Sequence, residues 1–151
     1  MKTILTLIFL AIANSSAHSA EILYSDYRDA DSFKRISEHL SGKENKGRYQ
    51  VFRTDPNNRN GYYVALKLDK QDSGDRVSSI RIQYVQAGTL EAVTRDLAAE
   101  SIRKERILVG LTHDAWSETN KLPTAWKLDF LDESGTILFS SQSFLWETRR
   151  S

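Results

Sequence analysis

The stretch that decides the fold is SSIRIQYV, residues 78–85. Apolar and polar side chains alternate strictly along it, with Ile80, Ile82 and Tyr84 on one side and Ser79, Arg81 and Gln83 on the other. Because successive side chains of a strand point to opposite faces of the sheet, this pattern predicts a strand with one face toward a core. Similar short runs flank it, separated by turn residues: YQVFRT (49–54), YYVALKL (62–68), ERILVGLT (105–112), TAWKLDFLD (124–132) and TILFSSQSFLW (136–146).

Regularly spaced short runs of this kind are typical of all-β sandwiches and barrels. We therefore expect an all-β fold, an immunoglobulin-like β-sandwich of about seven strands. DESG at 132–135 predicts a hairpin turn with Gly135 at positive φ. The closing SFLW, residues 143–146, is interpreted as the last strand, with Phe144 and Trp146 facing the core. The alternative is that these residues form an exposed contact surface.

Two segments are harder to assign. DSFKRISEHLSG, residues 31–42, predicts a short N-terminal helix, with Asp31 as its cap, an apolar stripe from Phe33 through Leu40, and Gly42 at its end. Residues 90–104 contain good helix formers, yet a sandwich needs a strand between its neighbours. Consistency with the whole fold favours a strand near 90–97 and a loop across 98–104.

The N-terminus has the pattern of a secretory signal peptide: Lys2, an apolar run over 4–13, then small residues. We expect residues 1–19 to be this signal, with cleavage near 17–20, and residues 20–151 to form one domain. An uncleaved anchor is the alternative, but the run is short of the roughly 20 residues that span a bilayer. The prediction is export, either to the periplasm or to the exterior.

Charge and sulfur content exclude several classes of function. Of 21 Lys and Arg only Lys2 lies in the predicted signal, so 20 basic residues remain against 20 acidic ones. A neutral chain is not typical of a general nucleic-acid binder. The chain has no Cys, so thiol chemistry, thiolate metal sites and disulfides are excluded. Nothing in the sequence implies a cofactor.

One pair of residues has catalytic potential. His113 precedes Asp114 in GLTHDAW, residues 110–116, and imidazole can act as a general acid or base near neutral pH. A hydrolase using carboxylates with His113 is therefore one hypothesis. The other reading is a structural loop, in which Asp114 or Thr112 bonds the backbone and Trp116 covers the end of the core.

A calcium site is a weaker hypothesis. Asp69, Asp72 and Asp75 surround Gly74 in DKQDSGD, residues 69–75, and Ca²⁺ binds clustered carboxylate oxygens. The spacing departs from the EF-hand pattern, so a turn between strands explains the loop equally well.

A basic segment offers candidate binding residues. Between positions 34 and 59, three acidic residues accompany seven basic ones: Lys34, Arg35, Lys43, Lys46, Arg48, Arg53 and Arg59. Such an excess of four positive charges in an otherwise neutral chain suits lipid head groups, acidic glycans or an acidic protein surface. An ordinary solvated surface is the alternative. Tyr62 adds a possible aromatic platform, because one of Tyr62 and Tyr63 must face away from the core of an alternating strand.

Four stretches together resemble a group of uncharacterised small secreted bacterial proteins with a β-sandwich appearance: RISEHLSGKEN (35–45), RTDPNNRNGYYV (53–64), GLTHDAW (110–116) and SFLWE (143–147). The resemblance covers most of the chain from 33 to 147 and implies no activity and no site residue. We therefore expect a non-catalytic binding or interaction module of the cell envelope, with an envelope protein, a glycan or an anionic surface as its partner. The alternatives are the His113 hydrolase and a structural subunit of an oligomer with SFLW at its interface.

Overall fold

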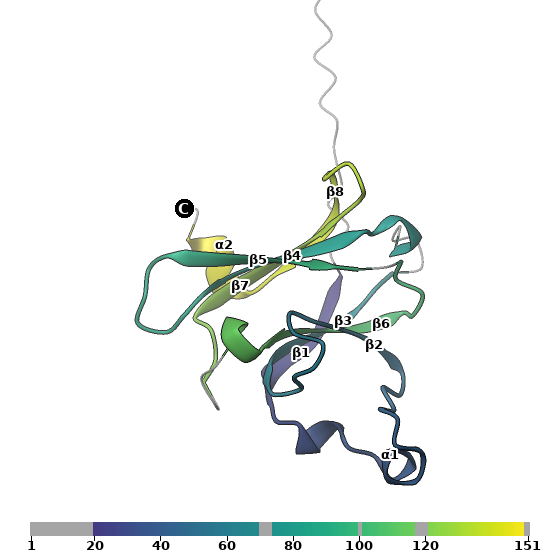
Figure 1. The fold of residues 1–151 in the computed structure, drawn as a ribbon. Helices are drawn as coiled ribbons and strands as arrows, with labels where there is room; N and C mark the ends of the chain where they lie inside the picture. Colours follow the sequence, from purple (N-terminus) through teal and green to yellow (C-terminus); the bar gives the residue numbers. More distant parts are fainter. Residues whose placement is uncertain (1–19, 70–73, 100, 117–120, 150–151) are drawn as a thin grey trace, which may run out of the picture.

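The structure is a computed structural model that describes residues 20–69, 74–99, 101–116 and 121–149, without the side chains of residues 36 and 37. The predicted signal peptide, residues 1–19, lies outside the described residues. The described chain is mostly β and forms two four-stranded sheets that face each other (Figure 1). This arrangement confirms the prediction of an all-β, sandwich-like fold.

The first sheet has the strand order β1-β3-β6-β2 and the second has the order β5-β4-β7-β8. The strand bounds are β1 Glu21–Arg28, β2 Tyr49–Arg53, β3 Gly61–Lys67, β4 Ser79–Val85, β5 Ala92–Ala98, β6 Arg106–Thr112, β7 Ala125–Leu131 and β8 Ile137–Gln142. Neighbouring strands are antiparallel except β2 and β6, which are parallel. The described residues thus contain eight strands, one more than the expected number of about seven.

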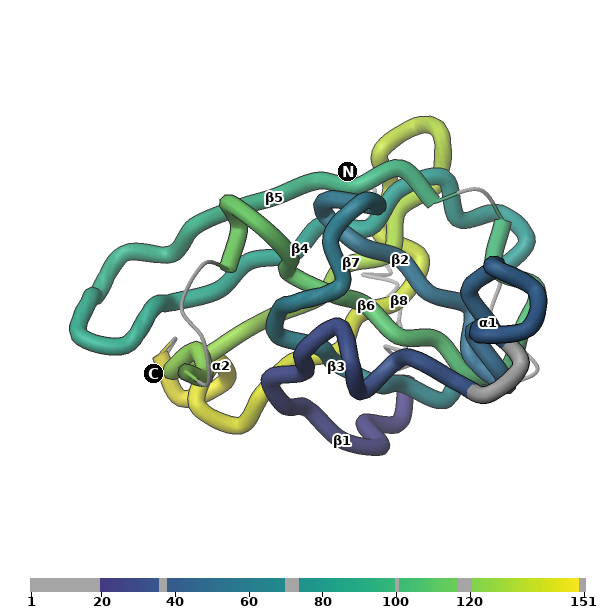
Figure 2. The backbone as a smooth tube through the Cα atoms, turned by 60° about the horizontal axis from the view of Figure 1, so that its bottom comes forward, coloured from purple at the N-terminus to yellow at the C-terminus, as the bar shows by residue number. Residues whose placement is uncertain are grey.

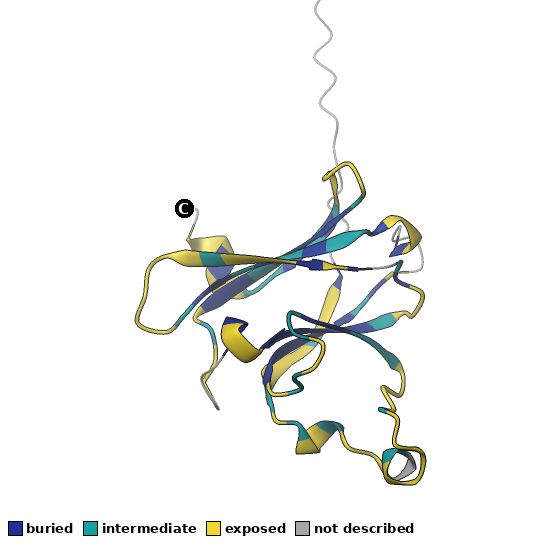
Figure 3. Cartoon of the chain, viewed as in Figure 1, coloured by how far each residue is buried: buried dark blue, intermediate teal, exposed yellow. Residues whose placement is uncertain are grey.

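The main core lies between the two sheets, where alternation along the strands predicted it. Ile80, Ile82 and Tyr84 of β4 are almost fully buried, and the inward residues of β6 and β7 join them in one cluster. Figure 3 shows the buried positions on the strands and the exposed ones mainly on the connections. Tyr84 also donates a hydrogen bond of 2.8 Å from its hydroxyl to the carbonyl of Ala115. Its polar atom is thereby satisfied inside the core.

Two local predictions are confirmed. The segment after β4 forms the strand β5 rather than a helix, and it pairs with β4 along its whole length. The turn between β7 and β8 has Gly135 at φ 82°, a conformation that glycine adopts without steric penalty. Whole-fold consistency was therefore a better guide to β5 than helix propensity.

The prediction that SFLW forms the last strand is wrong. The chain leaves the sheet after β8 and residues Phe144–Thr148 form a short helix, α2. Trp146 is buried at 8% exposure, whereas Phe144 is 76% exposed. A stretch of five residues is too short to distinguish a period of 2 from a period of 3.6, so Phe144 and Trp146 were placed on one face in error.

The predicted N-terminal helix is present but shorter. A 3-10 turn at Asp31–Phe33 precedes helix α1, Ile36–Ser41, which ends at Gly42 with φ 66°. Asp31 lies inside the 3-10 turn and does not cap α1, which begins after Arg35 without a side-chain cap. Leu40 is 86% exposed, so it does not take part in the expected apolar stripe. Strand β1, which precedes this region, was not predicted.

Candidate functional site

The connection between β1 and β2, residues 29–48, crosses the outer face of the first sheet. Strands β1 and β2 are the two edges of that sheet. They run parallel, because β1 is antiparallel to β3, β3 is antiparallel to β6, and β2 is parallel to β6. A connection between parallel strands must pass over a face of the sheet. Figure 1 shows this connection, with α1, below the first sheet and on the side away from the second. We call it the β1–β2 connection.

A small second core lies under the β1–β2 connection. Tyr63, Ala65 and Leu108 point to the outer face of the sheet, yet they are at most 2% exposed. Phe33 of the connection covers Tyr63, with ring centroids 4.8 Å apart. The ring of Tyr63 in turn lies against Gly110, where a Cβ atom would come within 2.4 Å of the ring. The connection therefore packs onto a surface shaped to receive it.

A buried ion pair ties the connection to the sheet. Arg53 of β2 donates two hydrogen bonds to the Glu44 carboxylate, at 2.8 and 3.1 Å. Its Nε donates to the Tyr63 hydroxyl at 2.7 Å, and its guanidinium lies 5.1 Å from the centroid of the Phe33 ring. The hydrogen bonds from Arg53 lower the pKa of the Glu44 carboxyl. Arg53 is therefore a structural residue whose three nitrogens each donate a hydrogen bond inside the protein, and its charge is balanced by Glu44.

Two further basic residues of the candidate set are also paired. Arg59 forms a 2.7 Å ion pair with Glu38 and lies 3.9 Å from Glu44. Lys34 is paired with Asp31 on the surface. Three of the seven candidate cations, Arg53 among them, are thus neutralised within the chain.

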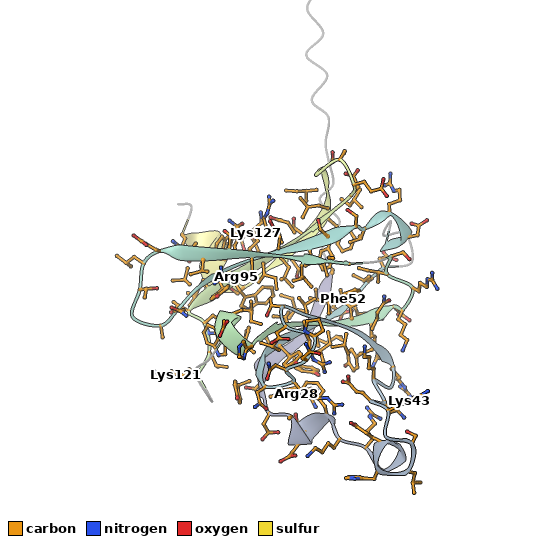
Figure 4. All side chains as sticks on the ribbon, viewed as in Figure 1. Arg28, Lys43, Phe52, Arg95, Lys121 and Lys127 are labelled. Atoms are coloured by element: carbon orange, nitrogen blue, oxygen red, sulfur yellow. The ribbon has the colours of Figure 1, made fainter. Side chains whose placement is uncertain are left out.

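The other four form no ion pair with any described residue: Arg35, Lys43, Lys46 and Arg48. All four are exposed and all lie on the β1–β2 connection; Figure 4 shows Lys43 pointing outward from it. Lys104, on the loop before β6, joins them by donating to the carbonyls of Gly47 and Tyr49 at 3.1 and 3.3 Å. We call Arg35, Lys43, Lys46, Arg48 and Lys104 the cationic surface.

A narrow groove of about 50 Å³ runs between the cationic surface and the sheet. Its floor is apolar and aromatic, with Phe33 and Tyr49 among its residues, and three cations line it: Arg28, Arg35 and Lys46. Arg28 lies over the Phe33 ring at 4.5 Å and donates to the Tyr24 hydroxyl, so it is held in place. Glu44, the acidic residue of the lining, is already bound by Arg53. The groove can therefore take a small anionic group with an apolar neighbour.

Tyr62 does not belong to this surface. It points into the sandwich at 4% exposure, with its ring centroid 5.9 Å from that of Trp116. Tyr63 faces outward as alternation requires, but the β1–β2 connection covers it completely. The expectation that one of the two tyrosines is exposed is therefore wrong. At the groove, Tyr49 is partly exposed.

His113 and Asp114 meet on an exposed 3-10 turn. The His113 Nε2 atom lies 3.1 Å from the Asp114 carboxylate, and their side chains are 55% and 91% exposed. His113 has a φ of 53°. The structural reading of this loop fits the contacts: Thr112 exchanges hydrogen bonds with the backbone of Asp55, and Trp116 is buried at the end of the core. None of the cavities described here is lined by His113.

The calcium candidates are only partly described, since Asp72 lies outside the described residues. Asp69 and Asp75 both line an open cleft of about 490 Å³ beside the loop before β6. A second cleft, of about 690 Å³, also borders Asp75 and extends to the β7–β8 turn. In the described part of the chain, no three His, Asp or Glu residues are grouped closely enough to hold a metal ion.

Comparison with known proteins leaves function to be inferred from the site. No family model, no curated protein and no solved structure matches the chain. Among the described residues, no helix is both long enough and apolar enough to cross a membrane. The cationic surface, with its groove, is the candidate functional site. Sequence reasoning found four of its residues but missed Lys104, Arg28 and Phe33.

Proposed function

We propose that this protein is an exported, non-catalytic binding module of the cell envelope, and that its cationic surface binds an anionic component of the envelope. The N-terminal signal pattern supports export. The immunoglobulin-like topology expected from the spacing of the turns stays a prediction.

The proposal rests on a difference in pairing among the basic residues: some are bound by carboxylates of the chain, and others form no ion pair. Arg53 and Arg59 are bound by internal carboxylates, whereas Arg35, Lys43, Lys46 and Arg48 form no ion pair with a described residue, although the charge of Lys46 contributes to the lowered pKa of Glu44. Like charges held close together repel one another. Residues 29–48 carry five basic side chains against four acidic ones, and two of the acids are bound by Arg53 and Arg59 from outside the segment. An anionic ligand would relieve the repulsion among the remaining cations.

The groove adds selectivity to this attraction. Guanidinium groups present planar, forked donors that match carboxylate and phosphate oxygens, and Arg28 and Arg35 both line the groove. The aromatic floor of Phe33 and Tyr49 offers apolar contact next to those donors. The ligand favoured by this geometry is an anionic group, a carboxylate or a phosphate, attached to a small apolar or sugar-like body.

Binding of soluble polyanions tests the proposal. Polyphosphate and polyglutamate are titrated into the purified protein at low and high salt, and binding is followed by calorimetry. We expect binding that weakens as salt screens the charges. The variant Lys43→Glu/Lys46→Glu/Arg48→Glu should lose it, because the three substitutions reverse the sign of the surface.

A matched control separates local from global charge. The variant Arg76→Glu/Arg95→Glu/Lys121→Glu changes the net charge by the same amount at positions outside the β1–β2 connection, and it should bind as the unmodified protein does. Equal losses in the two variants would show that net charge alone drives binding and would refute the proposed surface. Absence of binding to both polymers at low salt would refute it as well.

A further inference from the structure

Three large apolar side chains are exposed together at one end of the molecule. Leu90, after the β4–β5 turn, is 91% exposed, and Phe144 and Leu145 of α2 are 76% and 49% exposed. Figures 1 and 2 both show α2 beside the long β4–β5 connection. A hydrogen bond of 2.8 Å from the Arg149 guanidinium to the Leu90 carbonyl joins the two segments. We call Leu90, Phe144 and Leu145 the apolar end.

The apolar end is held in place by its neighbours. Trp146 is buried against Val85 and Ala125 and anchors α2. The backbone N–H of Ser143 donates to the Trp126 carbonyl at 2.9 Å, which fixes the start of the helix. The backbone therefore presents Phe144 and Leu145 to solvent while Trp146 is turned inward. Of the three large side chains in SFLW, Trp146 therefore closes the core, and Phe144 and Leu145 do not.

Charges around the apolar end are mixed in sign. Glu91 follows Leu90, and Glu147 and Arg149 follow the two apolar residues of α2. Arg149 also lies 5.2 Å from the centroid of the Trp146 ring, which keeps its cation close to the apolar surface. With no strong field of one sign, contact at this end must depend mainly on the removal of apolar surface from water.

The size and shape of the apolar end favour a bilayer over a protein. A standard protein interface buries about 800 Å² on each partner, far more than three side chains supply. None of the three lines a cavity described above, so they form projections without an adjoining pocket. A bilayer interface accepts projecting apolar side chains without shape complementarity and places amphipathic groups such as Arg and Trp at the head-group level.

We propose that the apolar end docks on the surface of a lipid bilayer, with Leu90, Phe144 and Leu145 entering the interface and Arg149 at the level of the head groups. In Figures 1 and 2 this end lies opposite α1 and the β1–β2 connection. The protein could therefore rest on a membrane while its cationic surface remains free for the anionic partner. The membrane contact does not depend on the identity of that partner.

Co-sedimentation with vesicles tests this proposal. The protein purified after expression of the full chain is mixed with phosphatidylcholine vesicles, with and without added phosphatidylglycerol, at low and high salt. We expect binding to pure phosphatidylcholine vesicles with little dependence on salt, and added phosphatidylglycerol should contribute a separate, salt-dependent part through the cationic surface. The variant Leu90→Ser/Phe144→Ser/Leu145→Ser should lower the partition coefficient about 1,000-fold, because each of the three apolar side chains removed from the interface accounts for about tenfold.

Two controls keep the result interpretable. Leu40→Ser removes an equally exposed leucine from the β1–β2 connection and should leave vesicle binding unchanged. The melting temperature of the triple variant should equal that of the unmodified protein, since its three residues contribute little to the core. Failure of the unmodified protein to sediment with phosphatidylcholine vesicles, or equal sedimentation of the triple variant with them, would overturn the proposal.

Light scattering gives the competing outcome. If the unmodified protein is a dimer, the triple variant is a monomer and neither binds vesicles, the apolar end is a contact between copies of this chain and the bilayer proposal is wrong. Loss of polyanion binding in the Lys43→Glu/Lys46→Glu/Arg48→Glu variant with full binding to phosphatidylcholine vesicles would show that the two surfaces act separately.

Discussion

Breaking the ion pair between Arg53 and Glu44 should release the β1–β2 connection and destabilise the whole domain. The side chains of Arg53 and Glu44 are 4% and 18% exposed, and two hydrogen bonds join them. Removing one partner of a buried pair costs about 3–5 kcal/mol, because the other is left without compensation. Glu44 is the more exposed partner, so we expect about 3 kcal/mol for Glu44→Ala and about 4 kcal/mol for Arg53→Ala.

A double-mutant cycle measures the interaction itself. Unfolding by urea, followed by tryptophan fluorescence, gives the free energy of unfolding of the unmodified protein, the two single variants and the double variant. We expect the two effects to be non-additive by about 2 kcal/mol. Arg81 and Asp96 provide the control cycle, since they form a 2.9 Å ion pair with side chains 42% and 55% exposed. Such exposed pairs contribute about 0.2–1 kcal/mol. Equal coupling energies in the two cycles would refute the role of Arg53 and Glu44 as a buried attachment.

Three further outcomes follow from the structure. The pKa of Glu44 is lowered in the folded state. The stability that its charged form contributes is therefore complete above the unfolded-state pKa of about 4.3 and is lost as pH falls through the lower folded-state pKa. Urea unfolding at a series of pH values should show a weaker loss of stability in acid for Glu44→Gln, and an unchanged dependence of stability on pH would contradict this assignment. Trp146→Ala should lower the free energy of unfolding by about 3 kcal/mol, whereas the exposed Phe144→Ala should change it by less than about 0.5 kcal/mol; comparable losses in the two would contradict the orientation of α2. Gly110→Ala should displace the ring of Tyr63, because the new Cβ would lie 2.4 Å from it. The melting temperature should therefore fall by more than about 4 °C. An alanine variant with an unchanged melting temperature would rule out this close approach.

Alternation predicted the interior of the sandwich well because the side-chain period of a strand is fixed by its backbone. Ile80, Ile82 and Tyr84 face the core as their spacing requires. The same rule required one of Tyr62 and Tyr63 to face outward, but it did not say which, and it could not show that the β1–β2 connection covers Tyr63. Coverage depends on a contact between Phe33 and Tyr63, which are 30 positions apart, and local patterns contain no information about such contacts.

Strand β1 was missed for a related reason. Its residues Glu21–Arg28 lie at the edge of a sheet and most are exposed, so they lack a clear apolar face. The register of β1 also shifts between Ile22 and Tyr24, which breaks any strict alternation. Edge strands with irregular register give the weakest signal in a sequence.

The candidate site could be found only in part. The excess of basic residues between 34 and 59 was visible in the sequence, and four of them form the cationic surface. The sequence could not show that Glu44 neutralises Arg53 or that Glu38 neutralises Arg59, because these pairs join the connection to β2 and to the loop after it. Lys104 is far away in sequence and reaches the surface only through the pairing of β6 with β2.

The most direct test of the central claim is a crosslinking pull-down of the tagged protein from its own cell envelope at low and high salt. The cationic surface predicts one stoichiometric partner that is captured at low salt, is released at high salt and is lost in the Lys43→Glu/Lys46→Glu/Arg48→Glu variant. The Arg76→Glu/Arg95→Glu/Lys121→Glu control should capture the same partner. Capture of the partner by both variants alike would contradict the claim that the β1–β2 connection carries the binding function.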